Sequence, residues 1–153
     1  QTNYTNQSKG FRKLFNYISG SNIDSTKINM TTPVIQSKKI SMTTPVTQLN
    51  KDGENLIQFF LPSNFTKENA PEPIDKELRL IIIEEGYFAV IKYSGRSTDK
   101  NFNEHRKILK ENLLKKNVSI LSSAIKATYQ GPFTLPFLRR NEAMFRIEWN
   151  NND

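Results

Sequence analysis

The sequence contains no cysteine and only one histidine. Without cysteine there is no disulfide, no thiolate metal site, no cysteine nucleophile and no covalent cofactor attachment through a CxxCH motif. One histidine cannot build a histidine-rich metal site. Neither a GxSxG motif nor a glycine-rich phosphate loop is present. We therefore expect a protein that is not an enzyme, with an acid–base pair of carboxylates from distant segments as the alternative that stays open.

Long apolar runs are also missing. No stretch approaches the length of a membrane span, and mean hydropathy is −0.61. The 153 residues, 36% of them hydrophobic, are enough for one compact domain, which we place over residues 1–153. No signal peptide is visible, which favours a soluble, cytoplasmic protein. The chain opens at Gln1, however, so an exported form fits if an upstream signal was removed. The sequence leaves the oligomeric state open.

The charge balance is basic, but it is not concentrated. Lysine and arginine number 22 against 15 acidic residues, giving a net charge of +7. Such a surplus favours an anionic partner or surface. The longest basic runs are only pairs, among them Lys38-Lys39, Lys115-Lys116 and Arg139-Arg140. Because nucleic-acid binders usually gather their charge on one element, we predict no nucleic-acid partner.

An octapeptide of the form KIxMTTPV occurs twice, at residues 27–34 and 39–46. The offset of twelve residues is too short for a repeated domain and suits two strands of a hairpin. An even offset lets both copies present the same side chains to the same face. The proline in each copy removes a hydrogen-bond donor, so each strand is expected to end or bulge there.

Two segments have helical periodicity. Phe11, Leu14, Phe15 and Ile18 follow the i, i+3, i+4, i+7 pattern, which predicts a helix over residues 9–19 with Gly20 as its stop. A second helix is predicted over residues 99–116, after a group of N-cap candidates. Its expected buried side consists of Phe102, His105, Ile108, Leu109 and Leu113.

The remaining apolar segments indicate strands. Beyond the octapeptides, strands are predicted over residues 56–61, 78–83, 87–93, 125–129 and 143–149. Those at 78–83 and 87–93 would form a hairpin around Glu85-Gly86. A long proline-containing loop is expected over residues 62–76. The order of elements predicts an α+β fold: a curved antiparallel sheet or distorted β-barrel flanked by two α-helices.

Several segments together resemble the SOUL haem-binding protein family over residues 11–149. They are FRKLFNYISGSN (11–22), both KIxMTTPV copies, QFFLP (58–62), APEP (70–73), FAVIKYSG (88–95) and FLRRNEAMFRIEW (137–149). The resemblance implies a distorted antiparallel barrel with two flanking helices and pseudo-twofold halves, similar to bacterial effector-binding domains of the gyrase-inhibitor type. Family members usually carry a strand before the first helix. Here that strand is apparently missing before residue 1, which would expose one sheet edge.

The resemblance implies non-covalent binding of haem or a related tetrapyrrole, as a carrier, buffer or sensor. Such a ligand needs an apolar cleft and cations for its propionates. The first helix would supply one wall through Phe11, Leu14, Phe15 and Ile18. Met30, Phe133 and Phe137 are the candidates for the opposite wall of the cleft. Arg139 and Arg140 are the cations predicted to contact the ligand. The competing interpretation of the helical stripe is ordinary core.

Axial ligation of the iron is open. His105, Met30 and Met42 are the candidates, although a histidine or methionine on an apolar face is more often a packed core residue. No other metal is expected. Two other interpretations keep the fold: a general effector-binding module for apolar or cationic small molecules, and a protein-interaction module.

Overall fold

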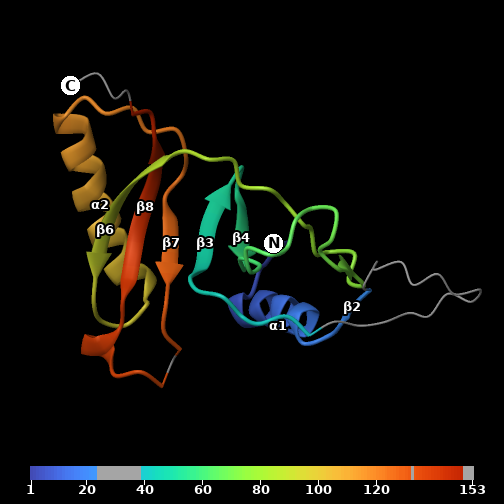
Figure 1. Ribbon diagram of the computed structural model, residues 1–153. Coiled ribbons are helices and arrows are strands. Elements are labelled where there is room, and N and C mark those ends of the chain that lie inside the picture. Colours follow the sequence, from blue (N-terminus) through green and yellow to red (C-terminus); the bar gives the residue numbers. More distant parts are fainter. Residues whose placement is uncertain (24–38, 132, 150–153) are drawn as a thin grey trace, which may run out of the picture. The chain divides into compact units, whose positions relative to one another are not determined.

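The computed structural model describes residues 1–23, 39–131 and 133–149, and they fall into two compact units (Figure 1). Unit 1 comprises Gln1–Thr44 and Glu54–Ile83, and unit 2 comprises Pro45–Gly53 and Glu84–Asp153. Each unit combines one α-helix with antiparallel strands. The chain therefore passes from one unit to the other more than once.

Unit 1 is built on short strands and one helix. Its elements are β1 (Thr2–Asn3), α1 (Gln7–Ile18), β2 (Asn22–Ile23), β4 (Glu54–Gln58) and β5 (Glu72–Pro73). Strand β1 pairs antiparallel with β4, placing Thr2 opposite Ile57, and β2 pairs antiparallel with β5. Helix α1 packs against β1 and β4. A short strand thus precedes α1 within the polar N-terminal residues.

Helix α1 confirms the first predicted helix but turns a different face to the core. Asn6 caps it by accepting a hydrogen bond from the Lys9 amide at 3.2 Å. Gly20, at φ +122°, follows its last turn as predicted. The buried positions are Gly10, Leu14, Tyr17 and Ile18. Phe11 and Phe15 are 37% and 46% exposed, so the predicted four-residue stripe divides into a buried pair and an exposed pair.

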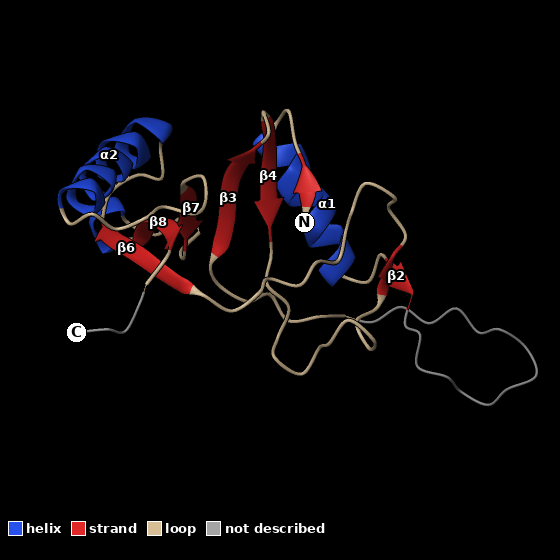
Figure 2. Ribbon diagram, turned by 90° about the horizontal axis from the view of Figure 1, so that it is seen from above, coloured by secondary structure: helices blue, strands red, loops and turns tan. Residues whose placement is uncertain are grey.

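Unit 2 is a four-stranded antiparallel sheet with α2 on one side. Its strands run in the order β3 (Val46–Lys51), β7 (Ile125–Thr128), β8 (Asn141–Ile147) and β6 (Tyr87–Tyr93). Helix α2 (Asp99–Lys115) packs on β6 and β8 (Figures 1 and 2). Leu113, Phe145 and Ile147 form the centre of this core. A short 3₁₀ helix, Pro136–Leu138, precedes β8.

Helix α2 matches its predicted bounds closely. The side chain of Thr98 caps its first turn, and Lys115 lies in the last turn, where a cation suits the negative end of the helix dipole. The predicted buried side is right only in part. Leu113 is buried, whereas Ile108 is 47% exposed. The helix covers the sheet along a narrower stripe than its apolar residues suggested.

The two hairpin predictions need correction. The first octapeptide copy lies outside the described residues. In the second copy, residues 39–45 form no strand, and β3 begins only at Val46. The Ile40 amide instead donates to the Ile18 carbonyl at 2.7 Å, which ties this segment to the end of α1. Pro45 cannot donate to a ladder, so a strand cannot extend smoothly back through it.

Residues 78–83 also form no strand, so the hairpin predicted around Glu85-Gly86 is wrong. The Leu78 amide closes a turn by donating to the Asp75 carbonyl at 3.0 Å, and the Arg79 amide donates to the Gln1 carbonyl at 2.9 Å. Strand β6 is present as predicted, but it pairs with β8. Leu80–Ile83 are exposed, so this apolar run neither enters the core nor pairs with a strand. An apolar run alone does not supply a hydrogen-bonding partner.

The α+β class is confirmed, with antiparallel strands and two helices. Within neither unit do the described strands close into a barrel, so the curved-sheet description holds and the barrel does not. Among the described residues, no helix is long and apolar enough to cross a membrane.

Candidate functional site

Unit 1 contains a groove of about 770 Å³ that is mainly apolar. We call it the apolar groove. Its apolar lining comes from the segment after β4, from the loop that follows, and from the irregular segment that leaves unit 1: Phe59, Phe60, Leu61, Phe65, Ala70, Leu80, Ile81, Ile82 and Ile83. Its polar lining consists of Gln1, Gln58, Thr66, Lys67, Glu68 and Arg79. A volume of this size lies within the range of about 300–1,000 Å³ typical of small-molecule sites.

Local hydrogen bonds hold the walls of the groove. The Ala70 amide donates to the Thr66 carbonyl at 3.0 Å, and the Thr66 amide donates to Asn69 Oδ1 at 2.6 Å, which fixes the loop after Phe65. On the other side, the side-chain amide of Gln58 donates to Gln1 Oε1 at 2.8 Å. The groove is thus lined by a loop folded on itself and by residues tied to β4.

Both positive and negative side chains line the polar part of the groove. Arg79 and Lys67 supply cations, while Glu68 supplies a carboxylate. A hydrogen bond with the Thr66 side chain and one with the backbone lower the pKa of Glu68, so it is ionised at neutral pH. The groove therefore offers apolar surface together with cations that can meet an anionic group on a ligand.

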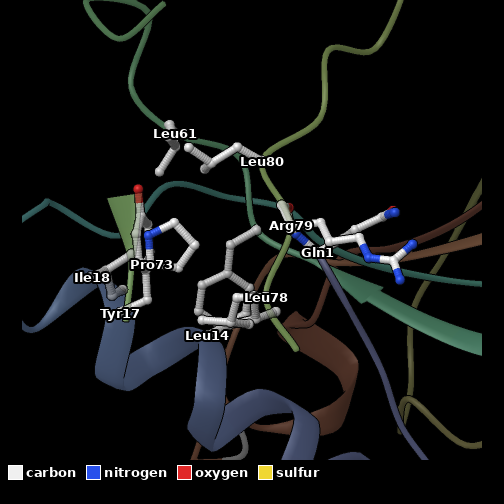
Figure 3. A pocket seen from close by; sticks show the side chains of 10 residues that line it. Gln1, Leu14, Tyr17, Ile18, Leu61, Pro73, Leu78, Arg79 and Leu80 are labelled. Carbon is white, nitrogen blue, oxygen red and sulfur yellow. Dashed lines mark hydrogen bonds between the residues drawn. The ribbon is translucent and has the colours of Figure 1, made fainter. Parts of the chain in front are cut away.

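A much smaller cavity of about 30 Å³ lies in unit 1 against α1. Figure 3 shows Leu14, Tyr17 and Leu78 around it, while the side chain of Arg79 extends away from them toward Gln1. Ile18 lines the same cavity. The space suffices for about one water molecule. Leu14 and Ile18, predicted as walls of a ligand cleft, thus lie buried around a water-sized space.

The exposed aromatic residues of α1 lie beside the apolar groove. The rings of Phe11 and Phe15 stack at 6.3 Å, and Phe11 meets Phe59 edge-on at 5.1 Å between ring centroids. Phe59 also lines the groove. Phe11 and Phe15 therefore connect to the groove through Phe59 without lining it themselves.

None of the predicted iron ligands is among the described residues that line the groove. His105 stacks on Tyr93 at 4.2 Å, and its Nδ1 lies 2.8 Å from the Asn101 carbonyl of its own helix. Met42 is 45% exposed and is not among the residues that line the groove. Met30 lies outside the described residues. In the described chain, no three His, Cys, Asp or Glu side chains gather in a way that could hold a metal ion.

The remaining predicted ligand contacts belong to unit 2, whereas α1 belongs to unit 1. Phe133 and Phe137 are exposed. Arg140 pairs with Glu142 at 2.6 Å and lies over the ring of Tyr129 at 4.3 Å. Arg139 donates from Nε to the Thr134 carbonyl at 2.7 Å. The contacts of these four residues with a ligand stay predictions.

The sequence did not single out most residues that line the apolar groove. Phe59, Phe60 and the Leu80–Ile83 segment read as strand residues, since apolar runs of this length usually are. Arg79 lies within the strand predicted over residues 78–83 and was not singled out. The usable signal was Pro62 shortly after Phe59 and Phe60, because a proline cannot continue a ladder. Strand β4 ends at Gln58, before the two aromatic residues, which are left to line the groove.

The chain was compared with known proteins. A family model described as SOUL heme-binding protein matches residues 1–146. No curated protein matches the chain.

Proposed function

The chain belongs to the SOUL heme-binding protein family, and from this we propose that it binds haem or a related tetrapyrrole non-covalently in the apolar groove. The observation that carries the proposal is the groove itself. It combines about 770 Å³ of space with nine apolar lining residues and two cations, Arg79 and Lys67. A carrier, buffer or sensor would each use such a site.

The groove suits the shape and polarity of the ligand. Haem is a flat apolar ring that carries two propionates on one edge. Leu80, Ile81 and Ile82 provide aliphatic surface for the ring, and Phe59 provides an aromatic one. Arg79 can donate two parallel hydrogen bonds to a propionate, as guanidinium groups do to carboxylates. The ring would be held by burial and the edge by charge.

The described lining contains no His, Cys, Met or Tyr, the residue types that ligate haem iron in proteins. Bound haem would bring redox-active iron and a Soret band that reports binding. The residues of this chain would bind the ring, orient it by its propionates and exclude water from its faces. We propose a binding role and assign no catalytic residue.

The lack of an iron ligand in the described lining also supports a second candidate. A groove that recognises an apolar body and an anionic edge would accept other amphipathic anions, so the chain would act as a general effector-binding module. A thermal-shift screen of tetrapyrroles against fatty acids and aromatic carboxylates separates the two. Stabilisation by tetrapyrroles alone supports the first candidate, and stabilisation by the other ligands alone supports the second.

A titration with hemin tests the site. We expect a saturable 1:1 shift of the Soret band for the unmodified chain. The Ile82→Glu variant places a carboxylate in the groove, and its desolvation should weaken binding by about tenfold or more. Ile82 is 64% exposed, so the variant should fold.

The matched control is Ile108→Glu, because Ile108 is a similarly exposed isoleucine on α2 that does not line the groove. Its hemin affinity should equal that of the unmodified chain. A featureless, non-saturating titration would reject the proposed function, and equal affinities for both variants would reject the groove as the site.

A further inference from the structure

Unit 2 has a separate hollow of about 540 Å³ beside the start of α2. We call it the unit 2 hollow. Two chain segments line it. Arg96, Ser97 and Thr98 come from the connection between β6 and α2, and Phe133, Thr134, Leu135, Pro136 and Arg139 come from the connection between β7 and β8. None of these residues lines the apolar groove.

Hydrogen bonds join the two segments and fix one of the arginines. The Gly95 amide donates to the Pro136 carbonyl at 2.9 Å. The side-chain amide of Asn141, which is fully buried, donates to the Gly95 carbonyl at 3.0 Å. The bond from Arg139 Nε to the Thr134 carbonyl holds the Arg139 side chain on the wall of the hollow. A ligand would therefore meet walls that are already organised.

The charge in the unit 2 hollow is of one sign. Its lining contains two guanidinium groups and no carboxylate. Asp99 and Glu142, which are close in sequence to lining residues, have cations of their own: Asp99 pairs with the buried Lys126 at 3.1 Å and Glu142 pairs with Arg140. Within the described residues, the Arg96 guanidinium has no hydrogen-bond or ion-pair partner. Two like charges in one hollow raise the local potential and favour an anion.

The hollow also offers hydroxyl and apolar groups. Thr98 Oγ1 accepts from the Asn101 amide at 3.3 Å, so its hydroxyl proton is still available for donation. Ser97 shares a 2.9 Å hydrogen bond with Thr128 in which either oxygen can donate. Leu135 and Pro136 add apolar surface next to these groups. A bare inorganic ion would leave this surface and most of the volume unused.

We propose that the unit 2 hollow is a binding site for a small organic oxyanion. A carboxylate or phosphate would lie between Arg96 and Arg139, with hydroxyl donors beside it, and an apolar body would lie on Leu135 and Pro136. Guanidinium groups bind both oxyanions through paired hydrogen bonds. The site is distinct from the apolar groove, and no bond is made or broken there.

An NMR titration of the full ¹⁵N-labelled chain tests this site with four probes at constant ionic strength: benzoate, phenyl phosphate, inorganic phosphate and neutral benzamide. We expect saturable shifts of the Gly95, Ser97 and Thr98 amides with benzoate, phenyl phosphate or both. The stronger of the two identifies carboxylate or phosphate as the preferred group. Inorganic phosphate should bind more weakly than phenyl phosphate, since it lacks the apolar body. Benzamide should not bind.

The Arg96→Gln variant should weaken binding of the preferred probe about tenfold, as expected for one lost charge-assisted hydrogen bond. Arg96 is exposed, and its guanidinium has no partner among the described residues, so the variant should fold. The control is Arg106→Gln, which removes the same charge from α2, where Arg106 lies over Phe102 at 5.9 Å. Equal binding by Arg96→Gln and Arg106→Gln, or equal affinity for benzamide and benzoate, would overturn the proposal.

Discussion

Two buried tyrosines, Tyr17 in unit 1 and Tyr93 in unit 2, differ in what their hydroxyl groups contact. Tyr17 donates to the carbonyl of the buried Pro71 at 2.7 Å. The Tyr93 hydroxyl has no hydrogen-bond partner in the described chain, although its ring stacks on His105. Burial raises the pKa of each to about 12. The two residues thus separate the effect of a hydrogen bond from the effect of burial.

At neutral pH, removing the two hydroxyl groups should change the free energy of unfolding by different amounts. Tyr17→Phe leaves the Pro71 carbonyl without its donor and should lower the free energy of unfolding by about 1–3 kcal/mol. Tyr93→Phe removes an unsatisfied buried group, so we expect a change within about 0.5 kcal/mol of zero or a gain. Because both pKa values rise from 10.0 to about 12 on folding, the folded chain favours the neutral phenols. The stability from this source is complete below pH 10 and is lost as the pH rises toward 12.

Urea denaturation at pH 7 and at several values between pH 10 and 12 measures both effects. Each Phe variant should flatten the alkaline loss of stability. The control is Tyr87→Phe, because Tyr87 is exposed, and it should change neither quantity. Equal losses at pH 7 for Tyr17→Phe and Tyr93→Phe would contradict the assignment of the hydrogen bond.

At the scale of elements, the orientation of α1 depends on the lack of a side chain at Gly10. A Cβ atom at that position would lie 2.9 Å from Tyr4 Cβ and 3.0 Å from Ile57 Cγ2. Ile57 is fully buried on β4. The helix therefore approaches β1 and β4 with its glycine side, and this places Leu14, Tyr17 and Ile18 inside while Phe11 and Phe15 stay at the surface.

Gly10→Ala should destabilise the chain despite the better helix propensity of alanine. Overpacking a core typically costs about 1–3 kcal/mol, whereas the propensity gain is about 1 kcal/mol. We expect a net loss of up to about 2 kcal/mol in the free energy of unfolding by urea denaturation. Gly131→Ala is the control, since a Cβ there meets nothing within 4 Å. A more stable Gly10→Ala variant would show that α1 does not lie this close to the strands.

This orientation explains why the sequence predicted α1 but not its buried face. The periodicity of large apolar residues located the helix within two residues. A glycine has no side chain, so it does not contribute to a pattern of apolar side chains. That pattern therefore could not predict the close approach at Gly10. Similarly, β6 and α2 were predictable from local apolar spacing. The pairing of β6 with β8 was not, because it depends on residues distant in the sequence.

The candidate site was less predictable than the elements. The aromatic stripe drew attention to α1, and Phe11 and Phe15 do lie next to the apolar groove through Phe59. The groove itself depends on Leu80–Ile83 staying out of a strand. An apolar run has the same composition whether it pairs in a sheet or lines a surface, so its role could not be settled from the residues alone.

On the scale of the whole molecule, the sequence resemblance and the family match agree over most of the chain. The net charge is +7. Among the described residues, two of the hollows are each lined by a pair of cations: Arg79 and Lys67 at the apolar groove, and Arg96 and Arg139 at the unit 2 hollow. The two sites combine apolar surface and cations in different proportions. The apolar groove is suited to a large ring, and the unit 2 hollow to a smaller anion.

We propose that the apolar groove holds a tetrapyrrole by burial and charge, with no iron ligand from the described residues that line it. The most direct test measures dissociation constants for hemin and metal-free protoporphyrin IX on the same preparation. Since the propionates and the apolar ring are common to both, the two constants should agree within about threefold. Hemin binding about a hundredfold tighter than the metal-free ring, with the spectrum of axially ligated iron, would contradict binding by burial and charge alone.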